Sequence, residues 1–195
     1  MAQLHVDTWI EHSHAQAARV ADGSLDLALS WVRTQDLEEY GLNARLIGAD
    51  RLYAVGASDD TSAVHAQETA VLLDEDTTSW ASWNTYAGQL ARDTGARAVR
   101  ISDGGITGPA FFDHVRRSRR PIINAPQGQA TPLPPDLFRR PVIEPQVYWT
   151  WSLVWRRGEE RAAVLAAVDA LTGGVGDLGI HSPDAWLPDS DPHKQ

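Results

Sequence analysis

The hydrophobic and polar positions near the start of the chain alternate with two different periods. Apolar and polar side chains alternate singly over residues 4–10, which predicts a strand. Small apolar residues then recur at helical spacing over residues 13–21, and Gly23 can adopt the left-handed conformation that ends a helix. Leucines alternate with polar or small residues over residues 25–30, which predicts a second strand. This part of the sequence therefore predicts a strand, a helix and a strand.

The rest of the chain continues this alternation of strands and helices. Strands are predicted at 42–47, 51–55, 70–73, 97–102, 121–125 and 148–155, and helices at 79–94, 109–119 and 159–171. Residues 33–41 are polar and predicted to be irregular. The proline-rich residues 126–145 predict turns, with one short helical piece near 135–138. After Gly174 the chain is rich in Gly, Asp, Pro and Ser, which predicts a loosely packed tail.

Composition narrows the class of protein. The chain has 195 residues, 43% of them hydrophobic, and is long enough to bury a core of its own. It contains no cysteine, which excludes disulfides and thiolate metal sites. The sequence shows neither a signal-peptide pattern nor an apolar run that could span a bilayer. We therefore expect a cytoplasmic protein without a membrane partner.

Charge argues against a nucleic-acid partner for the chain by itself. The formal net charge is −9, whereas binding to a phosphate backbone is driven by clustered basic residues. The one basic run, residues 116–120, follows Phe111, Phe112 and Val115. We interpret it as the solvated end of an amphipathic helix, where positive charge also suits the helix dipole.

Several short phrases occur in an order that resembles the effector-binding domain of LysR-type transcriptional regulators. They are G-x-L-D-L-A-L at 23–29, D-R-L-Y-A-V at 50–55, P-I-I-N-A-P at 121–126 and W-S-L-V-W-R-R at 151–157. The resemblance covers roughly residues 3–172. It implies an α/β protein with a two-lobed type 2 periplasmic-binding-protein-like fold, in which mixed sheets are flanked by helices.

In such a fold the chain passes from the first lobe to the second and returns. We expect residues 1–57 and 148–173 to form lobe I, residues 58–147 to form lobe II, and residues 174–195 to form a mostly irregular C-terminal tail. In the family, a winged helix-turn-helix and the first strand and helix of the effector domain precede the matching segment, and they are lacking here. We therefore expect a fragment or a stand-alone relative that forms a homo-oligomer through an exposed sheet edge.

The resemblance implies a module that binds a small metabolite, a carboxylate or an aromatic compound, in the cleft between its lobes. Closure of the lobes would then control the geometry of the oligomer, and DNA would be contacted only through the lacking N-terminal domain. We predict no catalytic residue, cofactor or metal, because the sequence contains no G-x-S-x-G elbow, phosphate loop or dinucleotide fingerprint. The alternatives are a stand-alone solute-binding protein or enzyme that uses the same cleft, and a truncated product without function.

Candidate effector-binding residues follow the strands, where free N–H groups at helix starts favour anions. Ser13 and Ser79 are the first choices because each hydroxyl is expected at a helix start, where the structural interpretation is that each serves only as an N-cap. Trp31 stands where some relatives carry a basic residue, and it favours an aromatic or less acidic ligand unless it packs in the core. The full set is His12, Ser13, Ser30, Trp31, Thr78, Ser79, Ser102, Asp103 and Asn124.

Two other groups of residues have a structural interpretation. His12 and His14 beside Glu11 are residue types that bind zinc, but their spacing matches no known ligand pair, so we interpret them as solvated loop histidines. Trp149, Trp151 and Trp155 lie on one face of a predicted strand. We interpret these three as core residues and not as a platform for stacking sugars or bases.

Overall fold

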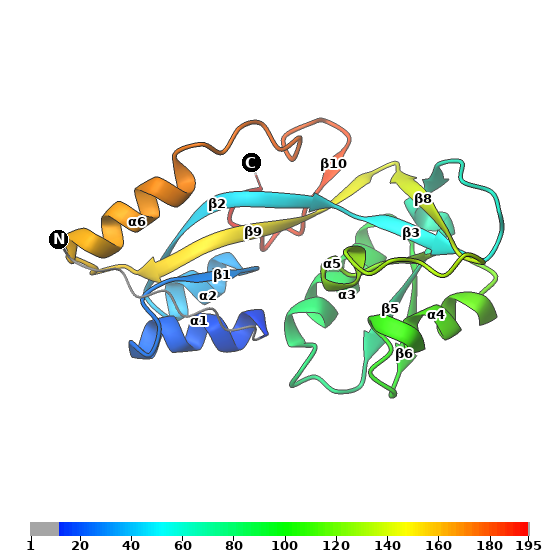
Figure 1. Ribbon diagram of the computed structural model, residues 1–195, viewed down its shortest axis with the longest axis horizontal. Coiled ribbons are helices and arrows are strands. Elements are labelled where there is room, and N and C mark those ends of the chain that lie inside the picture. Colours follow the sequence, from blue (N-terminus) through cyan, green and yellow to red (C-terminus); the bar gives the residue numbers. More distant parts are fainter. Residues whose placement is uncertain (1–11, 195) are drawn as a thin grey trace. The chain divides into compact units, whose positions relative to one another are not determined.

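The computed structural model describes residues 12–194 (Figure 1), so the strand predicted at 4–10 and Glu11 lie outside the described residues. The helices are α1 (Ser13–Asp22), α2 (Thr34–Glu39), a 3-10 turn (Ala66–Glu68), α3 (Ala81–Thr94), α4 (Gly108–Arg117), α5 (Pro126–Gln129) and α6 (Ala162–Thr172). The strands are β1 (Ala28–Ser30), β2 (Leu42–Arg51), β3 (Tyr53–Gly56), β4 (Val64–His65), β5 (Ala70–Asp74), β6 (Arg97–Ile101), β7 (Ile122–Ile123), β8 (Phe138–Ile143), β9 (Gln146–Arg156) and β10 (Ala185–Trp186). None of the helices within residues 12–194 is long and apolar enough to cross a bilayer.

The chain folds into two compact units. Within the described residues, unit 1 contains 12–49, 150–179 and 189–194, and unit 2 contains 50–149 and 180–188. The long strands β2 and β9 each contain residues of both units. A break at 48–50 was expected, but β2 continues through it, since pairing with β9 supplies partners that the local sequence does not reveal.

Unit 1 is a sheet with β9 at its centre and a helix on each face. Strand β9 pairs with β2 and, antiparallel, with β1, so that Ala28 lies opposite Val154. Helix α1 buries Ala17 and Val20 in one cluster with Val154, whereas Leu153 and Trp155 pack against Val168 of α6. Because neighbouring residues of β9 point to opposite faces, one strand serves both clusters.

Unit 2 is built on a six-stranded mixed sheet. Its strand order is β4-β8-β3-β7-β5-β6, with β5 parallel to β6 and β7, and β3 antiparallel to β7 and β8. Helix α3 buries Trp83, Tyr86 and Leu90, and the Trp83 indole N–H donates to Leu72 O on β5 at 2.8 Å. Helix α4 buries its apolar face, including Phe111.

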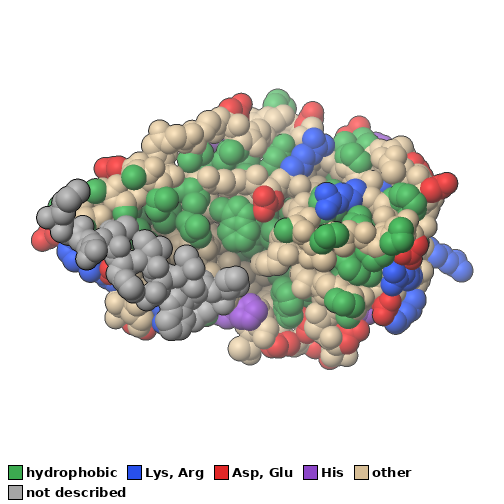
Figure 2. All heavy atoms as spheres, in the orientation of Figure 1, with side chains coloured by type: hydrophobic (Ala, Val, Ile, Leu, Met, Phe, Trp, Pro, Cys, Tyr) green, Lys and Arg blue, Asp and Glu red, His purple; other side chains and the backbone are tan. Residues whose placement is uncertain are grey.

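The basic run at 116–120 begins at the end of α4, as expected, and its first arginine is already paired. Arg116 donates to Asp136 at 2.7 Å and to Asp113 at 3.0 Å. On the face of unit 2 seen in Figure 2, basic and acidic side chains are interspersed and do not gather in one basic patch. This arrangement fits a solvated helix end.

Local signals in the sequence predicted several helix ends correctly. Helix α1 ends at Gly23 with φ +86°, and α3 ends at Gly95 with φ +78°, both in the left-handed region that favours glycine. Pro109 lies in the first turn of α4, where a missing N–H is tolerated.

Two expectations about irregular segments are wrong. Residues 33–41 contain α2, which starts at a capping box in which Arg33 N donates to the Asp36 carboxylate at 2.9 Å. The short helix expected at 135–138 is replaced by a turn and by β8, because the sheet supplies β3 and β4 as partners, and α5 forms earlier in the segment.

The C-terminal residues are mostly without regular structure, but they are not loosely packed. Ile180, Trp186 and Leu187 are each at most 8% exposed and belong to unit 2. Further along, Asp191 accepts from Thr150 Oγ1 at 2.6 Å in unit 1, and Ser152 Oγ lies 2.8 Å from His193 Nε2. Composition alone could not reveal these partners, since they lie on distant strands.

Candidate functional site

The start of α1 is tied to the end of β1 by two hydrogen bonds. Ser13 is 8% exposed and is the first residue of the helix, whereas the N-cap position is held by His12, which makes no side-chain cap bond. The Ser30 hydroxyl donates to Ser13 O at 2.8 Å, and the Trp31 N–H donates to Ser13 Oγ at 3.3 Å. Ser13 therefore links the helix to the strand instead of capping the helix.

This geometry leaves donors at the helix start for a ligand. A hydroxyl has one proton and two acceptor lone pairs, so Ser13 Oγ can accept from Trp31 and still donate its own proton. The backbone N–H groups in the first turn of an α-helix have no partners within the helix, and the helix dipole places partial positive charge there. The start of α1 can therefore hold an anionic group.

His12 and His14 flank Ser13 and add two imidazoles. Their rings stack with centroids 5.9 Å apart, and His14 Nδ1 is buried without a hydrogen-bond partner among residues 12–194. Burial lowers the pKa of His14, the neighbouring His12 lowers this pKa further, and Asp36 opposes the shift. A bound anion would favour the charged imidazole and raise the pKa again.

Ser30 and Trp31 have chiefly structural contacts. Ser30 is fully buried, and Trp31 is 2% exposed in unit 1. Ser30 Oγ also lies 3.4 Å from Trp31 O, so the serine holds both the helix and the strand end. The burial of Trp31 supports the packing alternative over direct contact with a ligand.

In unit 2 the loop before α3 is organised by carboxylates. Asp76 Oδ1 accepts from Thr78 N at 3.0 Å and from Ser79 N at 3.1 Å. The N-cap residue of α3 is Trp80, one residue after Ser79. Ser79 is therefore neither a cap nor buried against a strand, and the spacing of the residues alone could not distinguish it from Ser13.

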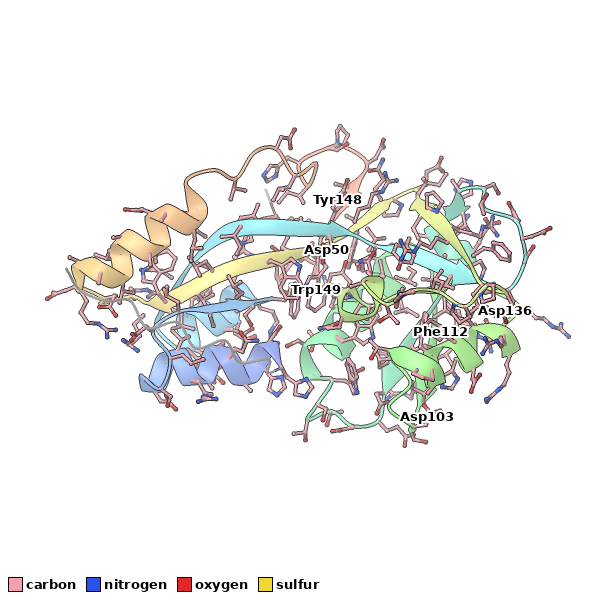
Figure 3. The ribbon with its side chains drawn as sticks, in the orientation of Figure 1. Asp50, Asp103, Phe112, Asp136, Tyr148 and Trp149 are labelled. Carbon is pink, nitrogen blue, oxygen red and sulfur yellow. The ribbon has the colours of Figure 1, made fainter. Side chains whose placement is uncertain are left out.

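Asp103 lies in the exposed loop after β6 (Figure 3) and pairs with α4. Both of its carboxylate oxygens lie 3.0 Å from His114 Nε2, and the hydrogen bond from His114 is the main cause that lowers the pKa of Asp103. A Cβ atom at Gly105 would lie 2.7 Å from His114 Cδ2, so the His114 side chain packs closely against this loop. Its neighbour Ser102 is exposed.

Asp74, which sequence reasoning missed, joins the two loops of unit 2. It is 4% exposed, and its oxygens accept from Asp76 N at 2.8 Å and from Gly104 N at 2.9 Å. The loop that carries Thr78 and the loop that carries Asp103 are thus held together by one buried carboxylate. A buried acid at the end of an apolar strand is the signal that could have found it.

Asn124 is engaged within unit 2. It is 1% exposed, and its side-chain amide donates to Tyr53 Oη at 3.2 Å. A Cβ atom at Gly128 would lie 2.4 Å from Asn124 Oδ1, so this oxygen is packed against the backbone of Gly128. These contacts favour a structural role.

The structure thus brings together His12, Ser13, Ser30 and Trp31 in unit 1, and separately the loops of Thr78, Ser79, Ser102 and Asp103 in unit 2. Asn124 belongs to neither group. The effector-binding roles of these residues, and the cleft expected between the lobes, stay predictions. Of the two groups, the one in unit 1 presents donors and imidazoles, whereas the one in unit 2 presents carboxylates.

No protein-family model and no curated protein sequence matches the chain. Similar solved structures include the reduced OxyR regulatory domain from Pseudomonas aeruginosa, with a TM-score of 0.59, 12% identity and coverage of 83% of this chain and 77% of that one. The CcmR regulatory domain from Synechocystis PCC6803, solved in complex with 2-PG, has a TM-score of 0.55, 13% identity and coverage of 83% and 79%.

CbnR, described as a LysR family transcriptional regulator, has a TM-score of 0.55 and 14% identity, with coverage of 85% of this chain and 58% of its own. These similarities extend over most of the described residues and both units. The chain therefore has the two-lobed, periplasmic-binding-protein-like fold of the effector-binding domains of LysR-type transcriptional regulators.

Proposed function

We propose that the chain is the small-molecule effector-binding module of a cytoplasmic LysR-type transcriptional regulator, and that it binds its ligand without chemical conversion. The shared fold supports this proposal, as does the 2-PG complex of the similar CcmR domain. The observation that carries it is the start of α1, where the Ser13 hydroxyl, the N–H groups of the first helical turn and two imidazoles lie next to one another.

The ligand class follows from the charge of these groups. Donors and a partial positive charge favour an anion, and a carboxylate can accept from an N–H group and from the Ser13 hydroxyl together. His12 and His14 supply further donors when protonated. We therefore propose a small carboxylate, aliphatic or aromatic, as the effector.

The hydrogen bonds of Ser13 also suggest how binding is communicated. A ligand that engages Ser13 Oγ acts on the same atom that accepts from Trp31 N, at the end of a strand paired with β9. A ligand with different affinities for two arrangements of the contact between Ser13 and Trp31 would shift their populations. We propose that the shift reaches partner copies in a homo-oligomer, and that any DNA contact belongs to a separate DNA-binding domain.

The direct test is a titration of a panel of small carboxylates into the protein by calorimetry. Ser13→Ala should weaken the tightest of them about tenfold, because a hydrogen bond to a charged ligand is lost. Ser30→Ala, which keeps the Ser13 hydroxyl, and Ser79→Ala in unit 2 are the matched controls and should bind nearly as well as the wild type.

Two results would contradict the proposal. One is that no carboxylate in the panel binds at millimolar concentrations, and the other is that Ser79→Ala loses affinity while Ser13→Ala does not. Turnover of a substrate by the protein would contradict the proposal that the ligand is bound without chemical conversion.

A further inference from the structure

A surface cavity lies in unit 1, where β9 passes into α6. A cavity of about 520 Å³ opens there, lined by the corner at Tyr40 and Gly41 and by the turn and helix start from Arg156 to Arg161. Ala21 near the far end of α1 also lines it. Ala21 is about 12 Å along the helix from Ser13, so this cavity is separate from the start of α1.

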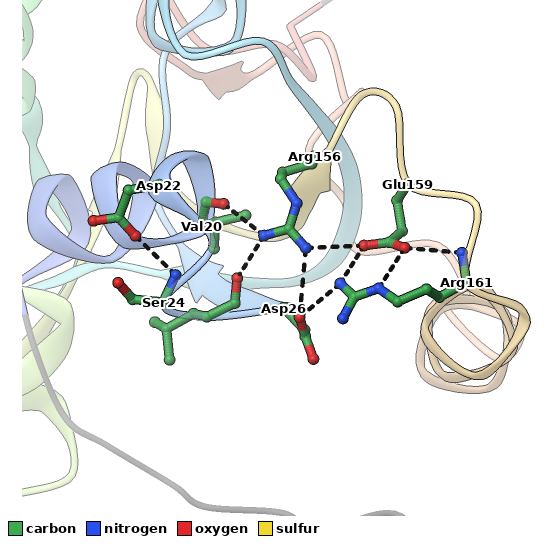
Figure 4. Close-up of polar contacts among 8 residues, drawn as sticks. Val20, Asp22, Ser24, Asp26, Arg156, Glu159 and Arg161 are labelled. Atoms are coloured by element: carbon green, nitrogen blue, oxygen red, sulfur yellow. Dashed lines mark hydrogen bonds and ion pairs between the residues drawn. The ribbon is translucent and has the colours of Figure 1, made fainter. Parts of the chain in front are cut away.

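Most of the charges around the cavity neutralise one another (Figure 4). Arg156 contacts the Glu159 carboxylate at 3.1 Å, and Arg161 contacts both Glu159 and Asp26. The hydrogen bond from Arg161 is the main cause that lowers the pKa of Glu159 to about 2, so its carboxylate remains ionised. Two arginines and two carboxylates thus form a balanced cluster.

The remaining two charged groups of the cavity are not balanced in this way. Arg157 is exposed, and its guanidinium donates to the carbonyl oxygens of Leu37 and Leu42, both at 3.4 Å, and to no carboxylate among residues 12–194. Glu160 is exposed, and its carboxylate has no hydrogen-bond or ion-pair partner in the described part of the chain. Arg157 and Glu160 thus line the cavity, and neither is paired with an opposite charge within residues 12–194.

Two of the residues that line the cavity are glycines with open space beside them. A Cβ atom built on Gly41 or on Gly158 would have no atom within 4 Å. Gly41 has φ +61°, so it also needs to be glycine, whereas Gly158 lies outside the left-handed region. The ring of Tyr40, 39% exposed, adds an apolar wall.

We propose that this cavity binds a zwitterion of the α-amino acid type, with its carboxylate at Arg157 and its ammonium at Glu160. A ligand with only a carboxylate would be repelled by Glu160, and one with only an ammonium would be repelled by Arg157. An amino acid satisfies both groups, and an apolar side chain can lie against Tyr40. This site is independent of the effector site proposed at α1.

L-phenylalanine is the probe for the test, and hydrocinnamate and phenethylamine are its analogues without the ammonium and without the carboxylate. Calorimetry should show that L-phenylalanine binds about fivefold more tightly than either analogue, the discrimination expected of partly exposed ion pairs. Absence of L-phenylalanine binding at millimolar concentrations, or equal binding of all three compounds, would overturn the proposal.

A large side chain introduced into the cavity tests whether L-phenylalanine binds there. Gly158→Leu should abolish L-phenylalanine binding, because the new side chain occupies the open space beside Gly158. Gly174→Leu is the matched control, since Gly174 also has open space around it, lies in unit 1 and does not line the cavity. Equal affinity of the two variants would overturn the assignment, even if the wild type binds the probe.

Exchanging single charges tests the two contacts. Glu160→Gln should let hydrocinnamate bind about as well as L-phenylalanine, and Arg157→Gln should do the same for phenethylamine. Arg117→Gln, an exposed arginine of unit 2, should change neither preference. The titrations are repeated in the Ser13→Ala background, which weakens any carboxylate bound at α1 but should leave unchanged the loss of L-phenylalanine binding in Gly158→Leu. Failure of this site and failure of the effector site are therefore distinguishable.

Discussion

The starts of α1 and α3 show how one local pattern yields two different sites. Both helices have a serine near their first residue, but Ser13 is buried against the end of β1, whereas the loop of Ser79 folds around Asp76. In unit 2 the carboxylates of Asp74 and Asp76 already accept the nearby N–H groups. At α1 the corresponding hydrogen bonds are accepted by two uncharged oxygens, Ser13 O and Ser13 Oγ. An anion that approaches the start of α1 is therefore not repelled by a carboxylate in these bonds.

The largest expected effect on stability concerns Asp74, whose carboxylate joins the two loops of unit 2. Asp74→Ala should lower the free energy of unfolding by about 3 kcal/mol, since two N–H groups lose a buried charged acceptor. Urea unfolding followed by tryptophan fluorescence measures this loss. Glu75→Ala, at the exposed neighbouring position, is the control. A similar loss of stability in both variants would contradict the conclusion that Asp74 holds the two loops together.

The hydrogen bond between the uncharged Ser30 hydroxyl and Ser13 O in unit 1 should contribute less to the free energy of unfolding. Ser30→Ala should lower the free energy of unfolding by about 1.5 kcal/mol, because Ser13 O loses its buried donor. The same urea experiment applies, with the exposed Ser102→Ala as control. A loss as large as that of Asp74→Ala would show that the charge of the acceptor does not explain the difference in stability between these two sets of hydrogen bonds.

The two helix starts should also differ in their response to pH. The pKa of His14 is lowered in the folded state by burial first, so the unfolded chain binds the proton more readily. The free energy of unfolding should therefore fall on acidification from about pH 7 through the unfolded pKa near 6.5. His14→Gln should remove this part of the pH dependence, as chemical denaturation at several pH values would show.

Ligand binding at α1 should show the linked effect. A carboxylate beside His14 raises its pKa, so binding should take up a proton and become tighter on going from about pH 8 to about pH 6. Calorimetry in buffers of different ionisation enthalpy counts the proton. Binding that weakens over this range would contradict contact between the ligand and the imidazoles.

The smallest effect is expected at Ser79. Ser79→Ala should change the free energy of unfolding by less than about 0.5 kcal/mol, because only its backbone N–H is used in the turn. Thermal unfolding is sensitive enough for this comparison. A larger loss would mean that the hydroxyl has a structural role resembling that of Ser13.

The sequence predicted what is decided locally and missed what depends on distant partners. The ends of α1 and α3 followed from single glycines, and the strand β5 followed from its apolar run. The packed C-terminal segment did not, because its hydrogen bonds reach Thr150 and Ser152 on β9, 41 positions earlier in the sequence. Neither the register of β9 nor its neighbours can be read from composition.

The candidate site shows the same division. Spacing placed Ser13 at a helix start, but its role depends on Trp31 N–H, which the fold brings from the end of β1. Asp74 was missed because a carboxylate at the end of a strand resembles ordinary turn chemistry. The cavity around Arg157 was missed because it forms only when the corner at Gly41 meets the start of α6.

The central claim is that anions bind at the start of α1, and an NMR titration of the ¹⁵N-labelled protein with the tightest carboxylate of the panel tests it most directly. The largest amide shifts should occur at Ser13, His14, Ala15 and Trp31, with small shifts at residues 79–82. Shifts concentrated at residues 79–82, or an unchanged spectrum for the amides of 13–15 at saturation, would contradict it.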